Sequence, residues 1–371
     1  MKRIALLFFM TIVLTSLQSY AGNDWRVNRI LHEGDMVYVA TDQGLFVLDK
    51  TAGLQGRKES PSSFLTDICL HEGIIYGIGW ETLDIWDHGQ HSEVLLDVYD
   101  YRAYYSDSKD EYWRWPQMAF APDGTLWISL GNELGKYRNG IYFVSENLFG
   151  TITDAERIKG ITTDQEGTLW IASFSGSERF GCAKYSKSEG LVPLAMDYSQ
   201  DVHAVKIDTK GTKWFATFKG LVCYDNAGEH LCIELPEEYA NGINDLCVLP
   251  EGGVLCATGN HLLYYDAGQY KKVCQVASSN YITCIDADGD SFYIGTPDGI
   301  FRYENGELAQ VLLPGQTTGI QNYTSTVQRS NSSTVYDLQG RKMKNEKVKS
   351  KNDRALPKGI YIVNGKKFVV K

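Results

Sequence analysis

Long hydrophobic runs are scarce in this sequence of 371 residues. After residue 21, no run approaches the roughly 20 apolar residues that a transmembrane helix needs. The sequence also has no Gly-rich phosphate-binding loop and no Gly-x-Ser-x-Gly motif. It therefore lacks the usual sequence signatures of an integral membrane protein, a P-loop enzyme and an α/β-hydrolase.

Histidine is sparse too, with seven residues of which only His88 and His91 lie close together. This pair falls in a Gly-containing turn with no third ligand nearby in the sequence, so it does not indicate a metal centre. We expect no metal site and no bound cofactor.

The eight cysteines lie mostly inside apolar, strand-like runs, where Cys behaves as a small hydrophobic residue. We expect buried thiols, and no thiol nucleophile, because no Cys has a His partner in its sequence context. One pairing stays open. A turn over Pro250–Gly253 would set Cys247 opposite Cys256, although directly opposed strand residues suit a disulfide poorly.

The one long apolar run lies at the N-terminus and has the features of a secretory signal. Lys2 and Arg3 precede the run Ile4–Ser16, and residues 19–21 (Ser-Tyr-Ala) provide a small-residue cleavage site. The first cysteine is Cys69, which argues against a lipid-anchored lipoprotein. We expect removal of residues 1–21 and export of a soluble mature protein to the periplasm, the cell surface or the medium.

The formal net charge of −10 is unevenly distributed. Residues 331–371 contain eleven Lys and Arg against three Asp and Glu, so residues 22–330 carry a net charge of −20. An acidic body argues against nucleic acid and anionic membranes as partners. The basic tail is interpreted as a separate unit.

Tyrosine (23), tryptophan (8) and glycine (36) are abundant, which is typical of short strands joined by Gly turns. A hairpin pattern recurs seven times, most clearly at Asp208–Asp225. Its second-strand anchors are Tyr38, Tyr76, Trp127, Trp170, Trp214, Leu255 and Tyr293. Their spacings of 38 to 51 residues fit blades of four short strands. The sequence predicts an all-β fold with a seven-bladed β-propeller over residues 22–314. A β-solenoid, the competing fold, would need shorter and more uniform repeats.

The repeat Asp-x-x-Gly-x-Leu-Trp-Ile-(Ala/Gly)-Thr-x-x-Gly-Leu-x-x-Tyr-Asp resembles that of the two-component-regulator propeller family. The match is clearest at Asp164–Ser173, Asp208–Asp225 and Asp288–Tyr303, and weakest around 66–87 and 244–266. In that family the propellers form the periplasmic sensor of hybrid regulators and often respond to oligosaccharides. This sequence shows no transmembrane, kinase or receiver segment, so the resemblance implies only the recognition half of such a system.

Residues 315–333 are polar and are interpreted as a linker, followed by a small β unit at 334–371. In this unit, Asn364-Gly365 between Ile360–Val363 and Lys366–Val370 predicts a tight hairpin. The segments 336–341 and 359–363 resemble the end of the type IX secretion C-terminal sorting domains of Bacteroidetes. That resemblance implies a secretion signal, and the alternative is a purely structural hairpin.

Asp/Gly clusters such as Asp286–Asp290 superficially suggest a calcium loop. The equivalent positions in other repeats are residues 122–124, 164–167 and 208–211, all at the first hairpin of a blade. Because turn chemistry explains all of them together, we interpret these clusters as turns.

The longest repeat spacing contains an aromatic and acidic insertion at residues 97–115, between the second and third blades. Connections between blades leave on the same face as the loops between second and third strands, so we expect the insertion to share one face with Trp80 and the loop 174–180. Aromatic rings with polar handles suit stacking on a sugar or on a protein partner. The predicted ligand-binding residues are Trp80, Tyr101, Tyr105, Tyr112, Trp113, Arg114, Trp115 and Arg179. The alternative is that these aromatics pack over the edge between the two blades.

These features favour an exported, non-enzymatic binding module that recognises a glycan or an extracytoplasmic envelope protein through its loop face. A polysaccharide lyase or hydrolase is a second hypothesis, with Asp107, Asp110 or Glu111 as acid and base. A structural or assembly role at the cell surface, directed by the tail, is the third.

Overall fold

The computed structural model describes residues 25–59, 64–79, 82–96, 117–130, 133–138, 141–144, 155–175, 181–194, 201–276, 281–316, 335–337, 359–363 and 366–370. The chain divides into two compact units, Met1–Leu313 and Pro314–Lys371, and each is described by itself. The described residues form strands and one short 3₁₀ helix, η1 (Glu237–Tyr239). None of the helices in these ranges is long and apolar enough to cross a membrane.

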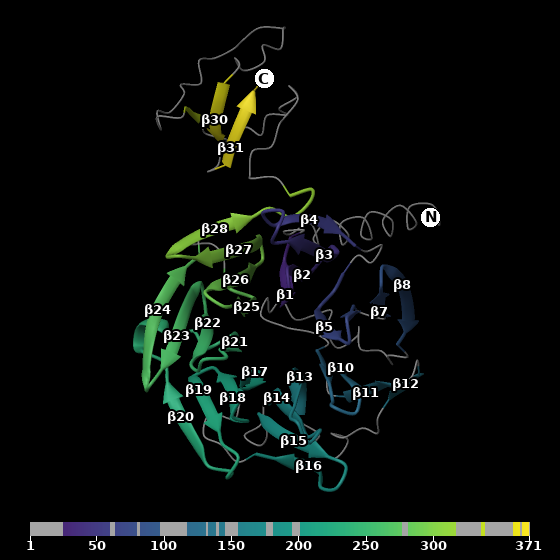
Figure 1. Ribbon diagram of the computed structural model, residues 1–371. Coiled ribbons are helices and arrows are strands. Elements are labelled where there is room, and N and C mark those ends of the chain that lie inside the picture. Colours follow the sequence, from purple (N-terminus) through teal and green to yellow (C-terminus); the bar gives the residue numbers. More distant parts are fainter. Residues whose placement is uncertain are drawn as a thin grey trace, which may run out of the picture. The chain divides into compact units, whose positions relative to one another are not determined.

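The first unit contains seven four-stranded antiparallel sheets, each built from four consecutive strands (Figure 1). Blade 1 holds β1 (Val27–Glu33), β2 (Met36–Thr41), β3 (Gly44–Asp49) and β4 (Gln55–Lys58). Blade 2 holds β5 (Asp67–His71), β6 (Ile74–Ile78), β7 (Thr82–Asp87) and β8 (Gln90–Leu95). Blade 3 holds β9 (Met118–Phe120), β10 (Leu126–Leu130), β11 (Glu133–Arg138) and β12 (Ile141–Val144). Blade 4 holds β13 (Ala155–Thr163), β14 (Leu169–Ser175), β15 (Cys182–Ser186) and β16 (Gly190–Pro193).

Blade 5 holds β17 (Val202–Ile207), β18 (Lys213–Thr217), β19 (Gly220–Tyr224) and β20 (His230–Glu234). Blade 6 holds β21 (Asp245–Val248), β22 (Val254–Thr258), β23 (His261–Asp266) and β24 (Gln269–Gln275). Blade 7 holds β25 (Cys284–Asp288), β26 (Ser291–Thr296), β27 (Gly299–Glu304) and β28 (Glu307–Val311). The predicted all-β, seven-bladed propeller is confirmed.

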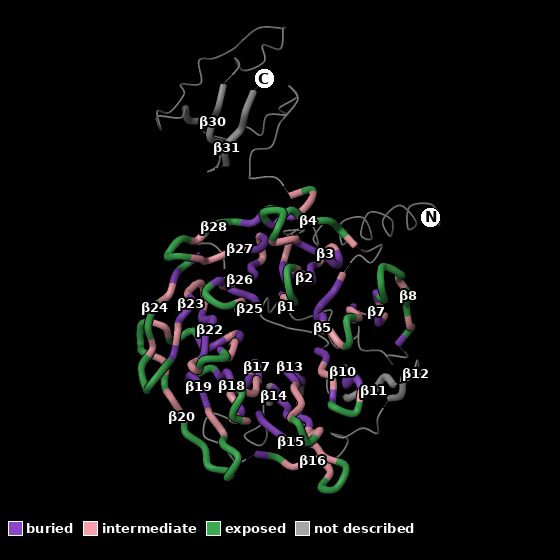
Figure 2. The backbone as a smooth tube through the Cα atoms, in the orientation of Figure 1, coloured by how far each residue is buried: buried purple, intermediate pink, exposed green. Residues whose placement is uncertain are grey.

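The blades form a closed ring around a central axis. The first strand of each blade contacts the first strands of the blades on either side, in the cyclic order β1, β5, β9, β13, β17, β21, β25 and back to β1. These seven inner strands therefore surround the axis, and the fourth strands form the rim (Figure 1). Exposed residues gather along the rim, whereas buried residues lie on the inner strands and between the sheets (Figure 2).

The Asp-x-x-Gly pattern forms the turn between the first and second strands. In blade 5, Asp208 Oδ1 accepts hydrogen bonds from the backbone N–H groups of Lys210 and Thr212, each at 2.9 Å. Its Oδ2 accepts the indole N–H of Trp214 at 3.0 Å. Gly211 has φ +85°, the left-handed conformation that glycine adopts without strain. Asp164 and Trp170 repeat this arrangement in blade 4, so the turn interpretation is confirmed there.

The Thr-x-x-Gly part of the repeat closes the opposite end of three blades. Thr217 Oγ1 donates to the Gly220 carbonyl at 2.8 Å, between β18 and β19. Thr41 and Thr296 make the same bond in blades 1 and 7. The repeat pattern thus specifies a turn at each end of the second strand.

Hydrophobic side chains fill the spaces between adjacent sheets. One cluster joins blades 4 and 5 through Trp170, Val205 and Phe215, which are 5%, 2% and 0% exposed. Another joins blades 7 and 1 through Tyr293, Val27 and other residues. A four-stranded sheet cannot cover both its faces alone, so this packing between neighbours stabilises the ring.

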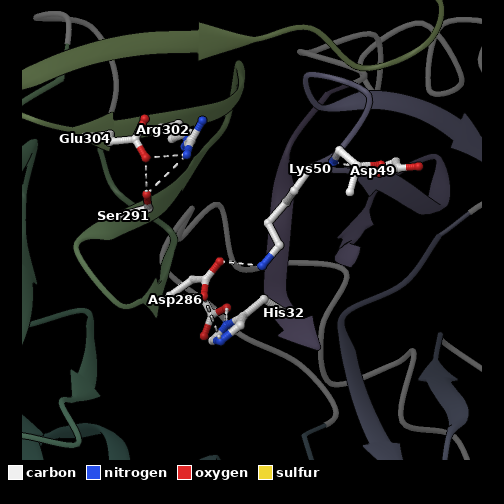
Figure 3. Close-up of polar contacts among 9 residues, drawn as sticks. His32, Asp49, Lys50, Asp286, Ser291, Arg302 and Glu304 are labelled. Atoms are coloured by element: carbon white, nitrogen blue, oxygen red, sulfur yellow. Dashed lines mark hydrogen bonds and ion pairs between the residues drawn. The ribbon is translucent and has the colours of Figure 1, made fainter. Parts of the chain in front are cut away.

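Blades 1 and 7 meet without sharing a strand, and polar contacts supplement their hydrophobic contact (Figure 3). His32 Nδ1, at the end of β1, lies 2.7 Å from Asp286 Oδ2 on β25. Its Nε2 lies 3.7 Å from Asp288 Oδ1, and Lys50 Nζ lies 2.6 Å from Asp288 Oδ2. Thr283 Oγ1 also donates to the carbonyl of Val27. The acidic cluster at Asp286–Asp290 therefore belongs to a strand and its turn, as predicted, and links the two ends of the ring.

The strand register that a turn at Pro250–Gly253 would give, with Cys247 opposite Cys256, is wrong. The hairpin register is Val248 with Val254, which sets Cys247 opposite Leu255 and Leu246 opposite Cys256. Five residues, Leu249–Gly253, separate the paired Val248 and Val254. Within them the Leu249 N–H donates to the Gly253 carbonyl at 3.1 Å, and Gly252 and Gly253 both adopt positive φ. All eight cysteines are free thiols, as expected.

The second unit contains one three-stranded sheet of β29 (Val335–Asp337), β30 (Gly359–Val363) and β31 (Lys366–Val370). Val363 pairs with Lys366, so two residues, Asn364 and Gly365, connect the strands as predicted. β29 pairs with β30 through Tyr336 and Ile362.

Candidate functional site at the axis mouth

The described residues form a small, shallow polar hollow, open to solvent, where the inner strands begin. It is lined by Arg26, Asn28, Lys159, His203, Asn244, Tyr281, Ile282 and Thr283. These residues belong to blades 1, 4, 5, 6 and 7, and blades 1 and 4 are not neighbours in the ring. The hollow therefore lies on the central axis. We call it the axis mouth, and the face on which it opens the loop face.

Three lining residues occupy the same local feature, a β-bulge near the start of an inner strand. The strand register shifts around Asn28 in β1, Lys159 in β13 and His203 in β17, so each is an extra residue without a direct partner. A bulge redirects the side chain of its extra residue away from the normal alternation of a strand. The bulges therefore explain how these side chains come to line the axis mouth instead of the core between blades.

The equivalent position in three further blades is Thr66, Asn244 or Thr283. The backbone N–H of each bonds to the second strand of its own blade, at 2.8, 2.8 and 2.9 Å respectively. Six blades thus place one polar residue at the same level of the axis. These residues form a polar ring above the apolar spaces between the sheets.

Asp201 links Lys159 of blade 4 and His203 of blade 5. Its Oδ1 lies 2.7 Å from Lys159 Nζ and 2.9 Å from His203 Nε2. Burial opposes ionisation of this carboxyl, but the hydrogen bonds and charges of His203 and Lys159 outweigh it and lower the pKa of Asp201 to about 2. Asp201 is therefore an anion at neutral pH that fixes the positions of Lys159 and His203.

Both ring nitrogens of His203 face protein oxygen atoms. Nδ1 lies 2.9 Å from the Ile243 carbonyl oxygen and Nε2 2.9 Å from Asp201 Oδ1. These two contacts fix the orientation of the imidazole ring at the axis mouth.

A second network fixes the blade 1 side of the mouth. Asn28 Nδ2 donates to Asp42 Oδ1 at 2.9 Å and to the Leu65 carbonyl at 2.8 Å. Asn28 Oδ1 accepts from Arg26 Nε at 3.2 Å. The Arg26 guanidinium lies 5.9 Å from the centre of the Tyr281 ring, within the range of a cation–π contact. This network holds a planar cation beside an aromatic ring at the rim of the hollow.

Asn244 keeps part of its hydrogen-bonding capacity. Its Nδ2 donates to the Ile282 carbonyl at 3.4 Å, and within the described ranges its Oδ1 bonds to no protein donor. The side chain is only half-buried, so Oδ1 is open to a ligand. The mouth therefore offers an acceptor from Asn244, cationic donors from Arg26 and Lys159, and the Tyr281 ring.

The closely spaced His88 and His91 bond to different carboxylates. His91 Nε2 lies 2.6 Å from Asp84 Oδ1, whereas the exposed His88 contacts Asp87. Within the part of the chain that the structure describes, no group of three or more His, Cys, Asp or Glu side chains could hold a metal.

All the ligand-binding residues predicted from sequence lie outside the described residues: Trp80, Tyr101, Tyr105, Tyr112, Trp113, Arg114, Trp115 and Arg179. The same is true of the predicted acids Asp107, Asp110 and Glu111. The sequence analysis missed the residues of the axis mouth. The available signal was a polar residue near the start of several inner strands, but single polar residues at strand starts are common.

A scan of protein-family models and a search of curated proteins both returned no match. The search of solved structures found propellers. The extracellular domain of the putative hybrid two component system BT4673 from B. thetaiotaomicron has a TM-score of 0.57 and 18% identity, over 76% of this chain and 38% of that chain. Virginiamycin B lyase from Staphylococcus aureus has a TM-score of 0.60 and 10% identity, over 75% of this chain and 94% of that chain.

PorZ, a surface component of the type-IX secretion system of Porphyromonas gingivalis, has a TM-score of 0.50 and 14% identity, over 91% of this chain and 63% of that chain. This chain covers less than two fifths of the BT4673 extracellular domain. At these identities the likenesses establish the β-propeller fold. Function has to be argued from the residues of the site.

Proposed function

We propose that this protein is a non-catalytic binding module whose propeller recognises a glycan at the axis mouth on its loop face. The observation that carries the proposal is the ring of redirected polar side chains around this mouth, next to the ring of Tyr281. A sugar presents hydroxyl groups around its edge and C–H groups on its faces. The mouth offers hydrogen-bonding groups for the former and an aromatic face for the latter.

The site is also pre-organised. Asn28, Lys159 and His203 are held by hydrogen bonds to protein groups before any ligand arrives. Ordering a long side chain on binding costs about 0.5–1.5 kcal/mol, and side chains already fixed avoid much of that cost.

The test is glycan-array screening followed by calorimetry on the full mature chain and on Tyr281→Ala and Asn244→Ala. We expect each substitution to weaken the binding of a selected glycan by about tenfold, the effect of losing one stacking or hydrogen-bonding contact. Phe218→Ala is the matched control, because Phe218 is 55% exposed and does not line the hollow. The proposal fails if no glycan binds. It also fails if Tyr281→Ala and Asn244→Ala bind the glycan like the wild type while Phe218→Ala binds it more weakly, a result that would indicate a broader protein-binding surface.

We also propose that residues 1–21 direct export and that the mature protein acts in the periplasm, at the cell surface or in the medium. The charged start, apolar run and small-residue site support this proposal. Fractionation of the full chain beside a variant truncated after Ser330 tests the part played by the tail. Identical distributions would show that the tail does not direct secretion, and retention of residues 1–21 on a cytoplasmic protein would contradict export.

A further inference from the structure

The loop face of blade 6 continues the polar surface of the axis mouth outward from the axis. Asn244 and Tyr281, which both line the mouth, lie in the connections that lead into and out of this blade. Between these connections lies the turn Thr258–His261, which joins β22 to β23. Because β21 to β24 run in order from the axis to the rim (Figure 1), this turn lies farther out than the mouth.

Hydrogen bonds fix both connections to this turn. On one side, Thr258 Oγ1 donates to the carbonyl of Tyr239 at 3.0 Å. On the other side, the N–H of Ile282 donates to the carbonyl of Gly259 at 2.8 Å, and Tyr281 directly precedes Ile282. The segments that carry Tyr239 and Tyr281 therefore flank the same turn.

Tyr239, in η1, provides a second aromatic ring on this face. Its ring centre lies 5.2 Å from that of His261 with an angle of 65° between the planes, and part of its side chain is accessible to solvent. His261 begins β23, which is two strand spacings, or about 10 Å, farther from the axis than β21. The contact with His261 orients the Tyr239 ring at a place that lies outward from the mouth.

Amide side chains lie between the mouth and Tyr239. Asn241 is exposed, and its side chain makes no hydrogen bond to any residue in the described ranges. A Cβ added to Gly259 would lie 3.2 Å from Asn241 Nδ2, so this amide lies against the turn. Asn260 Nδ2 donates to a backbone carbonyl at 3.4 Å, and in the same ranges its Oδ1 bonds to no protein donor. Together with Asn244, these amides offer donors and acceptors along a line from the axis outward.

We propose that the glycan bound at the axis mouth is a linear oligosaccharide that extends outward over the β22–β23 turn and stacks a further sugar unit on Tyr239. This inference rests on the function proposed for the axis mouth and adds to it a second subsite and a chain direction. Sugar units present C–H groups on their faces and hydroxyl groups at their edges, which match an aromatic ring at each end and amides between. A monosaccharide can lie on only one of the two tyrosine rings, so affinity should rise with chain length.

The charges near this strip favour a neutral chain. Glu237 and Glu238 directly precede Tyr239, and η1 has no basic residue in its last turn. At the mouth, Lys159 is already paired with Asp201. The carboxylates beside Tyr239 would repel a chain that carries carboxylate or sulfate groups.

The test is calorimetry on the full mature chain with maltose and maltohexaose, cellobiose and cellohexaose, and xylobiose and xylohexaose. In at least one of these neutral series, we expect the hexasaccharide to bind about tenfold or more tightly than the disaccharide, the effect of one added stacking contact. Tyr239→Ala should remove most of this gain and leave disaccharide binding unchanged, whereas Tyr281→Ala should weaken the binding of both. Hexagalacturonic acid, a carboxylated chain, should bind more weakly than the neutral hexasaccharide.

The matched control is Tyr264→Ala. Tyr264 is also half-buried and lies in the same blade, but its hydroxyl contacts the carbonyl of Gly252 at 3.5 Å, in the turn at the opposite end of β22. This variant should bind both chain lengths like the wild type. If circular dichroism shows that Tyr239→Ala does not fold, Asn241→Ala takes its place with the same expected loss, because the Asn241 side chain is exposed.

The inference is overturned if chain length does not change the affinity of the wild type, or if Tyr239→Ala weakens disaccharide and hexasaccharide binding equally. Tighter binding of hexagalacturonic acid than of every neutral chain would also overturn it. Disaccharide binding that depends on Tyr281 but does not increase with chain length would reject the extension and leave the proposed function intact. If none of the three series binds, the extension is rejected, and the glycan array separately decides the proposed function.

Discussion

Replacing Asp286 by Asn removes the charge that faces His32 where the first and last blades meet. The two side chains are 15% and 30% exposed, and their hydrogen bond is 2.7 Å long. Hydrogen bonds to charged groups contribute about 1.5–3 kcal/mol when shielded from water, whereas exposed ion pairs contribute about 1 kcal/mol or less. Partial exposure places this contact at about 1–2 kcal/mol, so we expect Asp286→Asn to lower the free energy of unfolding by that amount near pH 6.

The effect should depend on pH in a definite direction. The hydrogen bond that His32 donates to Asp286 raises the pKa of His32 above its ordinary value of 6.5, although burial and the charge of Lys50 act against the rise. A raised pKa in the folded state stabilises the protein fully below the unfolded pKa, and this contribution is lost as the pH rises through the folded pKa. The wild type should therefore lose more stability than Asp286→Asn between about pH 6 and pH 8.5.

The assay is urea unfolding followed by tryptophan fluorescence at both pH values. Lys50→Gln is the control. It breaks the 2.6 Å contact with Asp288 at the same junction and also removes a charge that lowers the pKa of His32, so the wild-type fall in stability with rising pH should persist in this variant. If the wild type and Asp286→Asn lost equal stability between the two pH values, His32 would not be the group that couples ring closure to pH.

Three further predictions concern the turns, the mouth and the thiols. Gly220→Ala should lower the free energy of unfolding by about 3 kcal/mol or more, because φ is +153° and an added Cβ would lie 2.1 Å from the Ile233 carbonyl oxygen. Gly34→Ala, with no atom within 4 Å of the added Cβ, should cost only about 1 kcal/mol in the same urea experiment, and equal costs would contradict the close approach. The pKa of Asp201 is lowered to about 2, so its contribution to stability should be present above the ordinary pKa of 3.8 and be lost as the pH falls toward 2. In a pH titration followed by circular dichroism, Asp201→Asn should not show this acid-induced loss of stability. Ellman's reagent should detect all eight thiols in denaturant and should leave the buried Cys182 and Cys256 unreacted in the native protein. A count below eight under denaturing, non-reducing conditions would reveal a disulfide.

The fold was predictable because its local chemistry repeats along the chain. In blade 5, the Asp208 carboxylate at the first turn accepts the indole N–H of Trp214 on the second strand, and Asp164 and Trp170 make the same bond in blade 4. A single hairpin of this kind predicts little, but its recurrence along the chain allowed the blades to be counted. The register of a single hairpin was less predictable, since the five-residue turn at Leu249–Gly253 moved Cys247 away from Cys256.

The axis mouth could not be predicted in the same way. Asn28, Lys159 and His203 differ in chemistry and are far apart in sequence, and a bulge has no strong sequence signature. Their proximity follows only from closure of the ring. The insertion at 97–115 is noticeable from sequence alone, because many aromatic and acidic residues lie close together in it and it interrupts the repeat. Its role in binding stays a prediction.

The absence of a shared strand between blades 1 and 7 has a consequence for how the chain could be reconnected. Val27, near the start of the propeller, and Leu313, near its end, lie in the same hydrophobic cluster. Every sheet is complete within its own stretch of sequence. A circular permutant that joins these two ends and opens the chain between any other two blades would thus keep all seven sheets intact. By the same reasoning, a blade can be duplicated or exchanged as a unit without cutting through a sheet.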